Sequence, residues 1–125
     1  VIQGWESIDY LKHVNMYASK GIFLDKYPIV GIGSICRRQG TEEIEDLINV
    51  LHNEFNISLH GFGFKKRGVA RSCKALESSD SLAWSFEARR APVLLENHTH
   101  KNCANCLEWA LMWRESLISL IEGNK

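Results

Sequence analysis

Four short apolar segments, each followed by turn residues and then by a helical pattern, constrain the fold of this chain most. They begin roughly 24 to 30 residues apart, and they are Ile2 to Trp5, Pro28 to Gly33, Ser58 to Gly63 and Leu82 to Phe86. This interval fits one strand plus one crossover helix, which favours a parallel sheet with helices outside it. The chain is therefore predicted to belong to the α/β class.

Four β/α units do not close a barrel, because a (β/α)8 barrel needs eight. The alternatives are a small open sheet and the C-terminal half of a TIM (β/α)8 barrel. Glycines end three of the four segments, where a backbone approaches a ligand closely or turns tightly. Strands that end in this way, with functional loops on one face, are typical of barrels, so we favour the half barrel.

The intervals between the segments carry helical patterns. Thr41 is predicted to cap a helix whose apolar residues, from Ile44 to Phe55, recur at helical spacing. The other helices are expected at about Ser7 to Lys20, Gly68 to Glu77 and Cys103 to Glu122. No linker or low-complexity stretch interrupts residues 1–125, so we expect one domain.

Composition and the ends of the sequence bound the class of protein. The chain is 45% hydrophobic and 24% charged, which argues against disorder and against a coiled coil. It has no apolar run of membrane-spanning length and no leader pattern, so we expect a cytoplasmic protein without a membrane partner. A strand-like pattern starts at once from Val1 rather than from Met, so we expect that an N-terminal half is missing.

Basic residues gather after the predicted strands although the formal net charge is zero. Seven of the fifteen lie there: Arg37, Arg38, Lys65, Lys66, Arg67, Arg89 and Arg90. Loops that follow barrel strands share one face, so these residues are expected to form a rim suited to a phosphate backbone. The alternative is that they are solvated loop charges.

The strongest motif is His98-x-His100-x-x-Cys103-x-x-Cys106, which offers four nitrogen or sulfur ligands within nine residues. Zinc takes these ligands in tetrahedral geometry, and four protein ligands make a closed, structural site. The segment 98–106 is therefore a predicted zinc site, against the alternative of buried cysteines beside exposed histidines. Cys36 and Cys73 are expected to be small core or loop residues.

Two further polar residues are candidates for substrate binding or catalysis. Gln3, at the end of the first segment, offers a donor and an acceptor that suit a purine edge, although a lone glutamine is weak evidence. Asp80 comes just before the fourth segment, where it is either a nucleophile or an acceptor of backbone hydrogen bonds in a turn. The residues alone favour the turn.

These segments resemble a family in order and spacing over nearly the whole chain. Val1-Ile2-Gln3-Gly4 resembles the VQGG strand of tRNA-guanine transglycosylases, and Tyr27 to Gly33 resembles their YAIGGL strand. Ser58 to Gly63 resembles their YLMGVG segment, and Asp80-Ser81-Leu82-Ala83 resembles their DMFD motif. Cys103 to Trp109 resembles their CAVCQKW motif. Four sequence segments resemble even more closely the DpdA family of relatives that act on DNA, namely GIGSICRRQ, LHGFG, DSLAWSFEARR and HTHKNCANC.

The resemblance implies a TIM barrel that replaces guanine in DNA with a 7-deazaguanine derivative by ping-pong exchange, in a bacterial or phage-encoded protein. In the family an aspartate attacks the anomeric carbon and holds a covalent intermediate, and a second aspartate from the first half of the barrel assists proton transfer. Gln3 would read the base edge, backbone from Gly31 to Gly33 would line the base pocket, and Arg89 and Arg90 fall near arginines that hold the substrate strand.

The sequence departs from the family pattern at two positions. The family nucleophile is the second aspartate of DMFD, where this chain has Ala83, and only the first, Asp80, is retained. The family zinc site uses three cysteines and a later histidine, whereas His98 and His100 precede Cys103 and Cys106 here. The alternatives are therefore a tRNA-guanine transglycosylase and a non-catalytic zinc-stabilised nucleic-acid-binding module. The missing nucleophile favours the module, while Gln3 and the glycine-rich strands oppose it.

Overall fold

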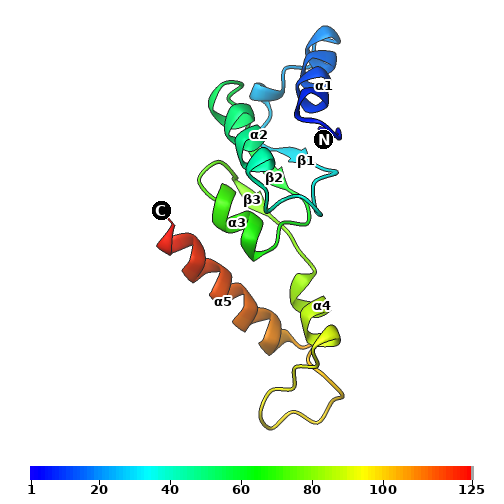
Figure 1. The fold of residues 1–125 in the computed structure, drawn as a ribbon, viewed down its shortest axis with the longest axis vertical. Helices are drawn as coiled ribbons and strands as arrows, with labels where there is room; N and C mark the ends of the chain where they lie inside the picture. Colours follow the sequence, from blue (N-terminus) through cyan, green and yellow to red (C-terminus); the bar gives the residue numbers. More distant parts are fainter. Residues whose placement is uncertain (125) are drawn as a thin grey trace. The chain divides into compact units, whose positions relative to one another are not determined.

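The computed structural model describes residues 1–124, which divide into two compact units, Val1–Asp80 and the part from Ser81 onward (Figure 1). The first unit contains a sheet of three parallel strands, β1 (Val30–Ile32), β2 (Leu59–Gly61) and β3 (Ser78–Ser79), in the order β1-β2-β3. Ile2 extends the sheet through an isolated parallel bridge to Ile32. The predicted α/β class with a parallel sheet is therefore confirmed.

The strand register gives the sheet two different faces. Val30 pairs with Leu59 and Ile32 with Gly61, and all four residues are buried. The alternate positions are Gly31, His60 and Ser78, which pair with one another across the three strands and are at least partly exposed. Side chains of parallel strands in register lie on the same face. The first set therefore faces the core and the second lines the opposite face.

Helices connect the strands of this unit close to the expected positions. They are α1 (Ser7–Ser19), the 3-10 turn η1 (Leu24–Lys26), α2 (Glu42–Asn53) and α3 (Lys66–Ser72). The apolar stripe of α2, namely Ile44, Leu47, Ile48 and Leu51, is buried as its spacing predicts. Only the third helix differs notably, because it ends at Ser72 rather than near Glu77.

The fourth apolar segment is not a strand, and this prediction was wrong. The strand is β3, two serines that carry no apolar pattern, and residues Ala83–Arg90 form the helix α4 instead. Periodicity cannot separate a short apolar run of strand from one of helix. In α4 the buried positions include Ser85 and Ala88, three residues apart, which is a helical interval. Asp80 consequently follows a strand rather than preceding one.

The second unit packs α4 against α5 (Leu107–Gly123), the last helix in Figure 1. The indole of Trp109 donates to the Trp84 carbonyl at 2.8 Å, and the indole of Trp113 donates to Glu87 Oε2 at 3.1 Å. The loop between these helices contains the His98 to Cys106 motif. Among residues 1–124, no helix is long and apolar enough to span a membrane.

Candidate metal centre and sheet-edge site

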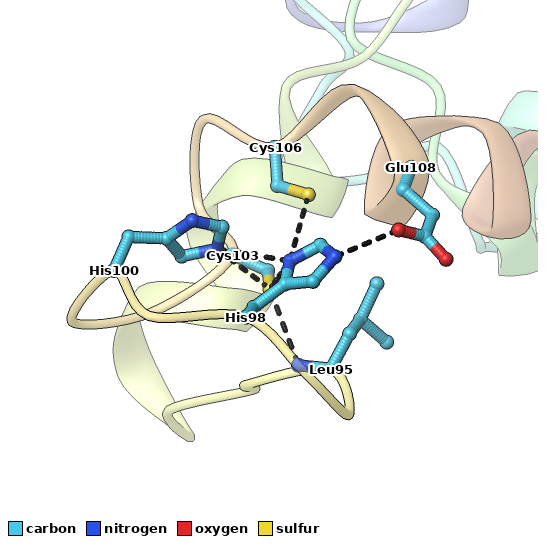
Figure 2. A network of polar contacts seen from close by, with 6 residues as sticks. All are labelled: Leu95, His98, His100, Cys103, Cys106 and Glu108. Atoms are coloured by element: carbon cyan, nitrogen blue, oxygen red, sulfur yellow. Dashed lines mark hydrogen bonds and ion pairs between the residues drawn. The ribbon is translucent and has the colours of Figure 1, made fainter.

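The four predicted metal ligands come together in the loop before α5 (Figure 2). Their donor atoms all lie within 4.8 Å of one another. His98 Nδ1 lies 3.3 Å from His100 Nε2 and 3.6 Å from Cys106 Sγ. Cys103 Sγ lies 3.1 Å from His100 Nε2 and 3.5 Å from His98 Nδ1.

The separations of 3.3, 3.5 and 3.6 Å are close to the edges of a metal tetrahedron, whereas the 3.1 Å separation is shorter than such an edge and the 4.8 Å span of the donor atoms is wider. With zinc–nitrogen bonds of about 2.05 Å and zinc–sulfur bonds of about 2.3 Å, two nitrogens lie about 3.3 Å apart and a nitrogen and a sulfur about 3.6 Å apart. Cys103 is fully buried, while His100 is exposed at the surface of the loop. The cluster is thus able to hold a metal ion, and four protein ligands would leave no position open for a substrate.

Backbone hydrogen bonds shape the loop around Cys103. Its N–H donates to the Val93 carbonyl at 2.7 Å, and its sulfur accepts from the Leu95 N–H at 3.3 Å. The Cys106 N–H donates to the Cys103 carbonyl at 3.1 Å, which closes a turn that ends at the N-cap of α5. These contacts fix the position of the Cys103 sulfur beside the other candidate ligands.

Glu108, in the first turn of α5, orients one of the ligands. Its Oε2 atom lies 2.7 Å from His98 Nε2, on the side of the ring away from the cluster (Figure 2). An ionised carboxylate only accepts hydrogen bonds, so Nε2 carries the ring proton and Nδ1 keeps its lone pair for a metal. No motif in the sequence singles out Glu108. Its position two residues after Cys106 was the available signal.

A second group of polar residues lies where the strands of the first unit end. Gln3 follows Ile2, Gly33 follows β1 and Asp80 follows β3. The Ser34 hydroxyl is 3.5 Å from Gln3 Oε1, and a Cβ atom added at Gly33 would lie 3.4 Å from Gln3 Cγ. The carboxyl ends of parallel strands share one edge of a sheet, and this edge is where α/β proteins bind their ligands.

Glycines at this edge make room for neighbouring groups. The buried Tyr10 hydroxyl donates to the Gly33 carbonyl at 2.8 Å, and burial raises the pKa of Tyr10. A Cβ atom at Gly31 would collide with the ring of Phe62. The space over Gly31 is therefore occupied by an aromatic ring, and of the two glycines only Gly33 lies directly against Gln3.

Asp80 is held by the loop that follows β2. Its Oδ1 atom accepts a hydrogen bond from the Gly63 N–H at 2.9 Å, and its Oδ2 atom lies 3.4 Å from His60 Nε2. The Asp80 side chain is nevertheless 59% exposed, so the carboxylate is fixed and open to solvent. Gly63 has a φ angle of 71°, which glycine adopts without strain.

The predicted basic rim is placed only in part as expected. Arg37 and Arg38 follow β1, and Lys65 is the N-cap of α3. Arg89 and Arg90 do not follow a strand, because they lie in the last turn of α4 in the second unit. Arg38 is bound within the protein, since its guanidinium stacks on Trp5 at 4.6 Å from the ring centroid and donates to the Trp5 carbonyl.

The other two cysteines are free. Cys36 is exposed in the loop after β1, and Cys73 is half-buried at the C-cap of α3. Cys36 is therefore a loop residue, as predicted, whereas Cys73 lies at the end of a helix rather than in the core or a loop. The four free cysteines form no disulfide in the part of the chain that the structure describes.

Comparison with known proteins places the chain in a family. The family model described as DpdA, "DeoxyPurine in DNA protein A", matches residues 1–124. Neither a curated protein nor a solved structure matches the chain. Because the match extends over nearly the full sequence, the chain belongs to the DpdA family, as its motifs indicated.

Proposed function

We propose that this chain is the C-terminal part of a barrel enzyme that replaces guanine in DNA with a 7-deazaguanine derivative. Membership of a family described by deoxypurine in DNA supports the class of substrate. One observation supports the proposed reaction most directly. The Asp80 carboxylate is fixed by the Gly63 N–H and is exposed at the carboxyl edge of the parallel sheet. Barrel enzymes build their active sites at this edge.

The main objection to Asp80 as the nucleophile is that the sequence resemblance aligns the family nucleophile with Ala83. The position at which β3 ends supports a different alignment. The strand ends at Ser79, and we propose that the segment Glu77-Ser78-Ser79-Asp80, rather than Asp80 to Ala83, takes the place of the family's DMFD. In that register Asp80 takes the position of the second aspartate. Ala83 is buried as the first residue of α4, in a different element from the strand end. An alanine at position 83 is therefore compatible with an intact nucleophile.

In the proposed reaction an Asp80 oxygen attacks the anomeric carbon of a deoxyguanosine in DNA from the face opposite the base. A carbon–oxygen bond forms while the bond to guanine N9 breaks, and the departing guanine takes the electron pair and a proton from the second acidic group, which residues preceding this chain are proposed to supply. N9 of the incoming deazapurine then bonds to the anomeric carbon as the bond to the Asp80 oxygen breaks, and its proton returns to the second acidic group, so the Asp80 carboxylate is restored. Gln3, beside Gly33 at the same edge, is proposed to read the base with its donor and acceptor.

The half barrel is the architecture that best accommodates this site. The sheet face with Gly31, His60 and Ser78 is open enough to leave these residues partly exposed. In a closed barrel such a face points inward, toward side chains of the remaining strands. We therefore propose that residues preceding this chain supply the other strands and the second acidic group.

We further propose that the cluster of His98, His100, Cys103 and Cys106 holds a structural zinc ion, on the basis of its donor set and spacing. Metal analysis of the purified protein should find one zinc per chain. Cys103→Ser should reduce this content, whereas Cys36→Ser should not. A protein without zinc, or one whose zinc content ignores Cys103→Ser, contradicts the assignment.

Asp80→Asn tests the nucleophile in the full-length protein. It should abolish guanine release and the covalent DNA adduct while leaving DNA affinity nearly unchanged, because the amide keeps the shape but not the charge. Glu87→Gln tests the second candidate carboxylate, which accepts a hydrogen bond from Trp113 in the second unit. An adduct that survives Asp80→Asn and disappears in Glu87→Gln reassigns the nucleophile. Survival in both places it outside this chain.

Two alternatives give different results in the same assay. A tRNA-guanine transglycosylase would form its adduct with tRNA and not with DNA. A zinc-stabilised binding module would bind nucleic acid and form no adduct with either. The fixed and exposed carboxylate of Asp80 favours an enzyme over the module.

A further inference from the structure

His60 lies at the centre of the exposed face of the sheet. It pairs with Gly31 of β1 on one side and with Ser78 of β3 on the other. Its ring meets the Phe62 ring edge-on, with the centroids 4.7 Å apart. The ring is thus held between an aromatic side chain and β3, and its side chain is only 20% exposed.

The two ring nitrogens of His60 have different partners. Nδ1 lies 2.7 Å from the Ser78 hydroxyl oxygen, and Nε2 lies 3.4 Å from Asp80 Oδ2. An ionised carboxylate cannot donate, so the proton of the neutral ring belongs on Nε2, toward Asp80. Nδ1 then accepts from the Ser78 hydroxyl, which is able to donate. The two contacts select the same tautomer.

The Asp80 carboxylate consequently receives a donor at each oxygen, the Gly63 N–H at Oδ1 and the His60 ring at Oδ2. Two donors from adjacent elements restrict rotation of the carboxylate about its side-chain bonds. Displacement at a carbon centre needs the attacking oxygen in line and within about 3 to 3.5 Å. A carboxylate held in this way loses less freedom when it attacks.

We propose that His60 is a positioning residue, which holds the Asp80 carboxylate by an Nε2–H hydrogen bond while Ser78 fixes the ring tautomer. This inference rests on the proposed function, because it assigns His60 a part in the attack by Asp80. His60 itself forms no bond to the substrate in this scheme, and it gives up no proton.

The test compares His60→Leu with His60→Gln in the full-length protein. Leucine removes the donor, whereas the glutamine amide keeps an N–H donor near the position of Nε2. His60→Leu should slow formation of the DNA adduct by about 10- to 100-fold at unchanged DNA affinity, since small misplacements of reacting groups have effects of this size. His60→Gln should recover most of the rate. His52→Leu, at an exposed position of α2, should leave it unchanged.

Equal loss in both His60 variants, or wild-type rates in both, overturns the proposal. Ser78→Ala separates it from a rival in which Ser78 is the nucleophile and His60 its base. Positioning by His60 predicts that Ser78→Ala still forms the adduct. If Ser78→Ala abolishes the adduct while Asp80→Asn retains it, Ser78 is the nucleophile and His60 does not position Asp80.

Nitrogen NMR of ¹⁵N-histidine-labelled full-length protein tests the contact without any reaction. The His60 signal, identified by its loss in His60→Gln, should report a proton on Nε2, and it should shift in Asp80→Asn. A proton on Nδ1 overturns the tautomer and the proposal with it. Correct nitrogen signals in a wild-type protein that never forms an adduct refute the proposed function and the positioning role, and leave only a structural contact.

Discussion

At the level of single residues, the candidate metal centre depends on a side chain that is not one of its four candidate ligands. Glu108 holds His98 in the tautomer and orientation that present Nδ1 to the other three ligands. Such partners of metal-binding histidines raise metal affinity by about 10- to 100-fold. We expect Glu108→Ala to weaken zinc binding by a factor in this range, measured by competition with a chromophoric chelator.

Two controls accompany this measurement. Glu108→Gln keeps an oxygen that accepts from His98 Nε2 and should retain more affinity than the alanine variant. Glu122→Ala removes an exposed carboxylate near the other end of α5 and should change nothing. Wild-type affinity in Glu108→Ala would show that the loop alone orients His98.

Tyr10 is a residue whose role belongs to the sheet edge. Its fully buried hydroxyl is the donor for the Gly33 carbonyl, so Tyr10→Phe leaves a buried acceptor unpaired. We expect a loss of about 1 to 3 kcal/mol in the free energy of unfolding, measured by urea denaturation. Tyr17→Phe removes a hydrogen bond to the Val1 carbonyl in an exposed setting and should cost less. Equal losses would contradict the prediction.

The raised pKa of Tyr10 makes the stability of the wild type, but not that of Tyr10→Phe, depend on pH through this residue. Unfolded tyrosine loses its proton near pH 10, whereas burial keeps the Tyr10 hydroxyl protonated to higher pH. Above about pH 10 the unfolded state therefore binds fewer protons, and the free energy of unfolding falls as pH rises. The difference in stability between wild type and Tyr10→Phe should shrink in this range. A constant difference would show that Tyr10 ionises equally in both states.

At the level of elements, the sequence predicts a helix best where local signals agree. For α2, a capping residue, acidic residues in the first turn and a buried apolar stripe all indicate the same helix, and the structure has it. For β3 there is no local signal, because its two serines carry no apolar pattern and the strand is defined by its backbone pairing with β2. The apolar residues at the start of α4, which follow β3 closely, predict a strand where the structure has a helix. A short strand defined by its partners cannot be found from its own residues.

The cap of α2 is testable by itself. Thr41 Oγ1 lies 3.5 Å from the Ile44 N–H and donates to the Arg38 carbonyl at 2.8 Å. Thr41→Ala removes both contacts and should lower the free energy of unfolding by about 1 kcal/mol. Thr41→Ser keeps the hydroxyl and should lose less. Thermal unfolding at matched concentration measures both variants, and identical midpoints for alanine and serine would exclude a capping role.

At the level of the whole molecule, the two sites differ in how far the sequence reveals them. The four candidate metal ligands lie within nine residues, so their spacing alone identifies them. The sheet-edge site joins Gln3, His60 and Asp80, which only the parallel register brings to one face and one edge. The role of His60 cannot be predicted from the sequence, because its partners Ser78 and Asp80 lie 18 and 20 residues away. Only the pairing of β2 with β3 brings them together.

DNA binding by the whole protein tests which basic residues contact phosphates. Arg37 and Lys65 are exposed in loops that follow β1 and β2, at the edge that holds Asp80, while Arg89 and Arg90 are exposed at the end of α4. Each lost phosphate contact reduces the slope of log affinity against log salt by about 0.9. We expect Arg37→Ala with Lys65→Ala to weaken binding and to reduce the slope by about 2, measured by fluorescence anisotropy from low to moderate salt.

Arg89→Ala with Arg90→Ala should act in the same way if the arginines of α4 also hold the strand. The matched control is Lys20→Ala with Lys74→Ala, which removes two exposed lysines just after α1 and α3. In β/α units the helices return the chain to the opposite edge of the sheet, so these lysines lie away from the site and the slope should not change. A slope that falls equally in the control would show diffuse attraction of DNA by net charge. A slope that changes only in the Arg37 and Lys65 variant would confine the phosphate contacts to the loops that surround Asp80, and it would exclude the arginines of α4 from the path of the DNA strand.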